Sequence, residues 1–116
     1  MAVTQKTAEN FSIDQGADFS KNFTVTTDGS TAYDISDLTL QAQMRKSFDS
    51  SSATATFTAT VVTGSSGIYK LVLSNSTTAS ITAGRYVYDV ELILADSTIE
   101  KVHHGLVTVH PEATKI

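Results

Sequence analysis

The chain has 116 residues, a formal net charge of -4 and no cysteine, which excludes a disulfide framework and a thiolate metal site. Its eight Lys and Arg residues are scattered, and this argues against a nucleic-acid partner, since clustered basic side chains supply most of the affinity for a phosphate backbone. No apolar run approaches the roughly 20 residues that span a bilayer, and the N-terminus lacks the features of a signal peptide, so we expect one soluble domain with no membrane partner, folded in a reducing cytoplasm.

Apolar and polar residues alternate along most of the chain, and turn signals recur between the alternating runs, which is typical of β-strands. No stretch has the apolar spacing of a long amphipathic helix, so the predicted fold class is all-β. Residues 1–9 are a polar N-terminal arm, and residues 10–116 are expected to form a single domain. Phe11 and Ile13 indicate its first short strand, which ends in a turn at residues 14–17.

A second and a third strand follow. Phe19, Phe23 and Val25 share one parity, and Asp28-Gly29 comes next as a hairpin-type turn, because both residue types tolerate positive φ. The third strand is predicted to have one solvated face. Its inward positions are Leu38, Leu40, Ala42 and Met44, and its outward positions are Thr39, Gln41, Gln43 and Arg45.

A Ser-rich loop at residues 48–53 leads into a Thr-rich fourth strand at residues 54–62. A flexible turn at residues 63–67 separates this strand from a fifth, whose core face carries Tyr69, Leu71 and Leu73. Residues 75–82 are expected to hold one helical turn, with Ala79 and Ile81 tucked under it.

The last two strands are the longest and form a closing hairpin at residues 84–112. The core face of the first carries Tyr86, Tyr88, Val90, Leu92 and Leu94. In the second, the parity of the apolar positions changes between Val102 and Val107, and we expect a bulge or bend at Gly105 to cause this.

Seven antiparallel strands in about 100 residues predict a two-sheet β-sandwich of immunoglobulin-like outline, with an open barrel as the alternative. The cysteines and tryptophan that mark antibody domains are absent from the sequence.

The three histidines invite a metal hypothesis, but His103 and His104 are adjacent in a strand and point to opposite faces, and His110 lies roughly 20 Å further along. Solvated or interface histidines are the preferred interpretation. Asp14 to Asp18 resembles a calcium loop only in having two acids around a glycine, so a hydrogen-bonded turn is preferred there.

Asp89 and Glu91 lie on one face of a strand at a spacing of about 7 Å, but no cleft is indicated around them, so they are interpreted as surface residues. Tyr86 and Tyr88 are expected to pack in the core, with each hydroxyl reaching a backbone carbonyl near the rim. The residues therefore predict no catalytic, cofactor or metal site, and the protein is not expected to be an enzyme.

Several motifs together resemble a known group of proteins. They are Phe11 to Phe19, Asp37-Leu38-Thr39, Gln43 to Ser47, Gly67 to Leu71, Gly84 to Glu91, Gly105 to Val109 and Pro111 to Thr114. The chain resembles the small β-sandwich proteins and domains of tailed bacteriophage virions, and is similar to the N-terminal domain of baseplate upper proteins and to small virion proteins of marine myoviruses and cyanophages.

The resemblance implies a non-enzymatic virion structural protein, made in the host bacterial cytoplasm, that forms a homo-oligomer and binds other virion proteins in the tail, baseplate or neck. A capsid decoration protein that binds the major capsid protein is the alternative, and a carbohydrate-binding or adhesin module is a weaker one. As a hypothesis, the Thr-rich residues Thr54 to Thr60 form a sheet edge that pairs with a neighbouring chain, and a neighbour orders the arm from Met1 to Asn10.

Overall fold

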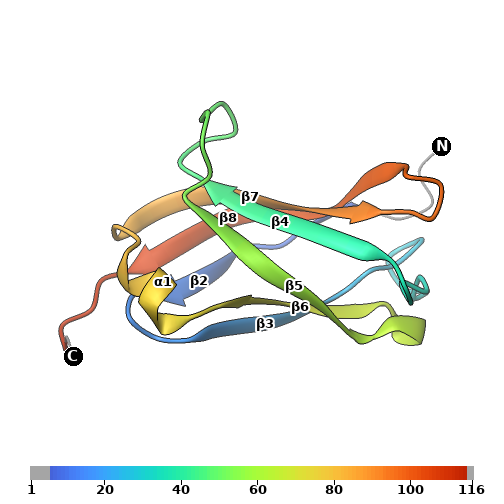
Figure 1. Ribbon diagram of the computed structural model, residues 1–116, viewed down its shortest axis with the longest axis horizontal. Coiled ribbons are helices and arrows are strands. Elements are labelled where there is room, and N and C mark those ends of the chain that lie inside the picture. Colours follow the sequence, from blue (N-terminus) through green and yellow to red (C-terminus); the bar gives the residue numbers. More distant parts are fainter. Residues whose placement is uncertain (1–5, 115–116) are drawn as a thin grey trace.

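The computed structural model describes residues 6–114, and β-strands are its main regular elements (Figure 1). This confirms the all-β class. In chain order the elements are β1 (Thr7–Ala8), β2 (Phe11–Asp14), β3 (Phe19–Thr24), β4 (Thr39–Arg45), β5 (Ala55–Thr63), η1 (Gly64–Ser66), β6 (Ile68–Leu73), α1 (Asn75–Ala79), β7 (Gly84–Ile93) and β8 (Ile99–His110). In the described part of the chain, no helix is long and apolar enough to cross a membrane.

The strands form one curled, mixed sheet in the order β1-β8-β7-β4-β5-β6-β3, and β2 also pairs with β8. The seven strands predicted from the sequence correspond to β2 through β8, and β1 is an additional two-residue strand. Because Thr7 and Ala8 pair with His103 and His104, the last part of the predicted N-terminal arm belongs to the sheet.

The two N-terminal strands pair in parallel with β8, which corrects the expectation of a wholly antiparallel fold. Thr7 aligns with His103 and Phe11 with Val107, so β1 and β2 follow one register and act as a single interrupted strand. Parallel neighbours need a long connection, and here most of the chain separates them. The prediction of antiparallel pairing relied on short connections, so it could not include the parallel pairing of β1 and β2 with β8.

Strand β5 changes partners along its length. Its residues Ala55 to Phe57 pair with β4, and Thr58 to Thr63 pair with β6. Figure 1 shows β5 running obliquely from the group of β4, β7 and β8 toward β6 and β3. The strand lies between β4 and β6 in the sheet order, but each of its paired residues has a partner on one side only. This agrees with the prediction of an unpaired edge along Thr54 to Thr60, and the order itself ends at β3 and at the N-terminal strands.

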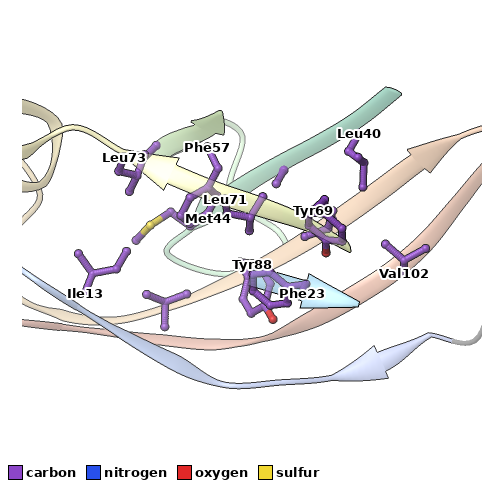
Figure 2. Close-up of a cluster of buried hydrophobic side chains, with 14 of the residues drawn as sticks. Ile13, Phe23, Leu40, Met44, Phe57, Tyr69, Leu71, Leu73, Tyr88 and Val102 are labelled. Atoms are coloured by element: carbon purple, nitrogen blue, oxygen red, sulfur yellow. The ribbon is translucent and has the colours of Figure 1, made fainter. Parts of the chain in front are cut away.

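The core lies inside the curl of the sheet and follows the alternation of the strands (Figure 2). The predicted inward positions Leu40, Ala42 and Met44 are buried, as are Tyr69, Leu71 and Leu73. Aromatic rings meet near its centre: the Phe23 and Tyr69 rings stack with centroids 5.3 Å apart, and the Phe11 and Tyr88 centroids lie 4.7 Å apart. Such ring pairs contribute about 0.5–1.5 kcal/mol beyond the burial of their area.

The break in the alternation of β8 lies at Val102 and not at Gly105. Val90 aligns with His103 and Glu91 with Lys101, so Val102 is the extra residue of a bulge. Both Val102 and His103 are consequently buried, whereas Gly105 keeps a regular partner in Tyr88. The predicted bulge in this strand is confirmed, but its predicted position at Gly105 is wrong.

Gly105 has a different function in the fold. A Cβ atom there would lie 2.6 Å from the carbonyl oxygen of Glu9 and 2.6 Å from Oδ1 of Asn10. The connection between β1 and β2 therefore runs so close beside β8 that only glycine leaves room. Asn10 Oδ1 accepts a hydrogen bond of 2.9 Å from the Leu106 N–H, which holds the connection against β8.

The predicted helical turn is present as α1, and Ser74 is its N-cap. Ile81 is buried as expected, but Ala79 is exposed, and Thr78 is the helix residue that faces the core. The Thr78 hydroxyl donates 2.8 Å to the Ala17 carbonyl, so a polar anchor occupies the position expected for an apolar one.

Candidate functional site

The side chains of β4, β7 and β8 that point away from the core form one surface, which carries both charged and apolar groups. The strand registers place Arg45, Val87 and Leu106 side by side, and Gln43, Asp89 and His104 form the next row. This surface is called the outer face. It consists of Gln41, Gln43, Arg45, Arg85, Val87, Asp89, Glu91, Lys101, His104 and Leu106, with Phe48 from the β4–β5 connection beside it.

The outer face is hollowed where β5 diverges from β4. An open groove of about 610 Å³ lies there, lined by Leu40, Gln41, Ala42, Gln43, Arg45, Thr56, Phe57, Asp89 and Glu91. The pairing of β4 with β5 ends at Ala42 and Phe57. Beyond Phe57, β5 pairs with β6 instead, so the part of β4 before Ala42 has no partner in β5. The groove is thus a consequence of the change of partner in β5.

Large apolar groups lie exposed on and beside the outer face. Phe48 is 59% exposed and Leu106 is 40% exposed. Phe48 and Val87 line a smaller hollow together with Arg45. Figure 1 shows the connection that carries Phe48 projecting from the body of the protein. Lys101 Nζ lies 5.7 Å from the centroid of the Phe48 ring, within the range of a cation–π contact.

Some of the charges on the outer face have partners within the chain. Lys101 Nζ lies 3.3 Å from an Asp89 carboxylate oxygen. The Arg45 guanidinium donates to the Ser50 carbonyl at 2.9 Å and to Gln43 Oε1 at 2.8 Å. The side chains of Asp89 and Glu91 are half-buried on this face, and both line the groove, which the sequence did not indicate.

The three histidines lie in different environments. His103 is buried, His104 is half-buried on the outer face, and His110 is exposed at the end of β8. The expectation of solvated or interface histidines is therefore wrong for His103, because the bulge at Val102 turns it toward the core. Among residues 6–114, no group of three or more His, Asp or Glu side chains is arranged to hold a metal ion.

His103 has a polar partner inside the core. Its Nδ1 and the Tyr69 hydroxyl form a hydrogen bond of 2.6 Å, in which the tautomer of the imidazole sets the donor. Burial lowers the pKa of His103 to about 4, and burial also raises the pKa of the Tyr69 hydroxyl above its usual value. Both groups are therefore neutral near pH 7 and form a structural pair.

A second hollow of about 530 Å³ lies between β1 and β3 and reaches His103. It is lined by Lys6, Thr7, Ala8, Glu9, Asn22, Phe23, Thr24, Thr26, Gly29 and His103. Lys21 Nζ on β3 lies 2.9 Å from Oε2 of Glu9, the residue that follows β1. Since β1 and β3 do not pair with each other, this ion pair links the two ends of the sheet.

The tyrosine predictions are confirmed. Tyr86 and Tyr88 are buried, and their hydroxyls donate to the carbonyls of Thr82, at 2.6 Å, and of Glu9. Burial raises the pKa of the Tyr88 hydroxyl above its usual value. Both residues thus attach neighbouring segments to β7.

The loop from Asp14 to Asp18 forms a turn, as preferred, in which the Ala17 N–H donates 3.1 Å to the Asp14 carbonyl. Asp18 does not converge with Asp14, because its carboxylate accepts 2.9 Å from the Asn75 N–H at the start of α1. Gln15 donates through Nε2 to the Ile81 carbonyl and accepts through Oε1 from the Glu112 N–H. The contribution of Gln15 was missed, since no local pattern marks such long-range partners.

The comparison with known families and with curated proteins finds no match for this chain, so its function is argued from its own residues.

Proposed function

We propose that the curled sheet is a two-layer sandwich of immunoglobulin-like outline. The neighbours β4-β7-β8 and β3-β6-β5 have the order of strands C-F-G and B-E-D in such domains. Strand β5 moves from one group to the other, as strands at the corners of packed sheets do. The bond from Tyr86 at the start of β7 to Thr82 four residues upstream has the form of a tyrosine corner.

We further propose that this chain is a non-enzymatic structural protein of a tailed-bacteriophage virion, a tail, baseplate or neck adaptor present in several copies. The outer face is the observation that carries the proposal. It exposes an aromatic ring on the β4–β5 connection, and an aliphatic side chain and charges of both signs on its strands, which are features of a protein-binding surface. The resemblance of the turns and core positions to phage sandwich proteins supplies the virion setting.

The contacts of the singled-out side chains favour a structural function over a catalytic one. His103, Tyr69, Tyr86, Tyr88 and Asp18 each bond to another segment of the chain. All of these contacts except that of Tyr86 connect segments that are distant in sequence, so the groups contribute to holding the fold together.

The ends of the sheet are less suitable for assembly than the outer face. Lys21 has core-facing parity on β3 and pairs with Glu9, and a charge placed inward on an end strand discourages pairing with another chain. Residues 7–8 of the predicted arm already pair with β8. A neighbour's contact with the arm would therefore involve residues 1–5, which lie outside the described residues.

The proposal is tested by gold-antibody electron microscopy on purified particles of the phage that encodes this chain. We expect label on the tail, baseplate or neck. Label over the head would instead assign capsid decoration, and particles without label would overturn the virion function. Binding of labelled protein to glycans, without label on particles, would favour the carbohydrate-binding alternative.

A further inference from the structure

The outer face separates its free charges along the direction of β7. Arg85 lies near the start of the strand, and Glu91 lies six positions later on the same face. Val87 lies between them and is directly opposite Leu106 of β8. A surface with a positive end, a negative end and apolar groups between them is complementary to a copy of itself turned by a half rotation.

We propose that the outer face binds a second copy of this chain through a twofold axis that crosses β7 at the level of Tyr88. Residues 85 and 91 are equally distant from residue 88, so this axis places Arg85 opposite the partner's Glu91, and the contact occurs twice. The two β7 strands then run antiparallel across the interface. An axis parallel to β7 would instead place Arg85 against the partner's Arg85, where like charges repel.

The pairing within the chain leaves these two residues available. In the described part of the chain, the ion pairs are Lys21 with Glu9 and Lys101 with Asp89. Arg85 is exposed, and Glu91 lines the open groove without an intramolecular ion pair. The charges that this geometry brings together are therefore those that the chain itself does not neutralise.

The apolar groups of the face lie in the row of Val87, one residue from the level of the axis. Leu106 pairs in register with Val87, and Phe48 lies beside Val87 in the smaller hollow. Burying an exposed aromatic ring near the centre of an interface supplies much of its affinity, while the charge pairs fix the orientation of the two copies. We expect a weak dimer whose affinity falls as salt rises, because its charge pairs lie at a partly solvated rim.

This inference deepens the proposed assembly of several copies, and it rests on the proposed function only in that respect. It concerns the purified protein and requires no particle. A dimer in solution with no label on virions would remove the virion function and keep the interface, and a labelled tail with a monomer in solution would do the reverse.

Sedimentation velocity over a range of protein and salt concentrations tests the interface. We expect a dimer that forms with rising concentration and weakens with added salt. Arg85→Glu and Glu91→Arg should each weaken dimerisation at least about tenfold, since each change introduces two repulsive contacts. The double variant Arg85→Glu with Glu91→Arg restores opposite charges at both contacts and should recover most of the lost affinity.

Lys70→Glu is the matched control, because Lys70 is on β6, outside the outer face. It should leave dimerisation unchanged, and thermal melting should show that all four variants stay folded. A monomer at every concentration, equal effects of the control and the outer-face variants, or a double variant no better than either single one would overturn the proposal.

Discussion

His103 connects the packing of the core with the response of the protein to acid. Its pKa is lowered from 6.5 to about 4 chiefly by burial; among the groups around it, Glu9 raises this pKa, while His104 and Lys21 lower it. A group whose pKa is lower in the folded state takes up its proton more readily in the unfolded chain. Its contribution to stability is complete above pH 6.5 and is lost as the pH falls toward 4.

We therefore expect the free energy of unfolding to fall by up to about 3 kcal/mol between pH 6.5 and pH 4 through His103 alone. Urea titrations across this range measure the loss. The variant His103→Gln removes the titrating group and should show a smaller slope, while His110→Gln changes an exposed histidine and should keep the wild-type slope. Equal slopes in the wild type and in His103→Gln would contradict this assignment.

Tyr88 shows how one side chain can hold two segments together. It is 1% exposed, its ring contacts Phe11, and its hydroxyl donates to the Glu9 carbonyl. Tyr88→Ala should cost about 3–5 kcal/mol of unfolding free energy, because it opens a cavity and leaves the Glu9 carbonyl without this donor. Chemical denaturation measures the cost, and a change within about 0.5 kcal/mol would show that the ring is not packed in the core.

At the scale of elements, the N-terminal strands depend on their close approach to β8. Gly105→Ala places a methyl group against the Glu9 carbonyl and Asn10 Oδ1, so we expect β1 to separate from β8 at a cost of about 1–3 kcal/mol. Hydrogen exchange should show faster exchange at the Glu9 and Leu106 amides. Gly84→Ala is the matched control, since Gly84 also has positive φ but has no atom within 4 Å of the added carbon. The same loss of stability in both variants would attribute the effect to backbone conformation and not to the close approach of Glu9 and Asn10 to Gly105.

The sequence predicts some of these elements better than others, and the difference is physical. Strict alternation in residues such as Leu40, Ala42 and Met44 reports burial on one face, so strands and core were predicted well. The parallel pairing of Thr7 with His103 joins distant parts of the chain, and local alternation carries no information about it. The same limit hides the change of partner in β5 and the outer-face groove that results from it.

At the scale of the whole molecule, inward-facing contacts hold the domain together, and the side chains of the outer face lie outside these contacts. The inward contacts of Tyr69 and Tyr88 hold distant segments together, whereas Phe48, Arg85 and Leu106 lie outside the core. In a particle with rotational symmetry, a weak contact repeated in every copy gives a stable assembly. The free surface, and not an internal cavity, is thus where we place the function.

The most direct test of this account is quantitative mass spectrometry of purified phage particles that carry the gene. We predict that the chain is present at a fixed ratio to the proteins of the tail or baseplate and remains after washing in high salt. If particles contain none of the chain, or if it is removed by washing like a contaminant from the host lysate, the chain is not a virion structural protein and the central claim is wrong.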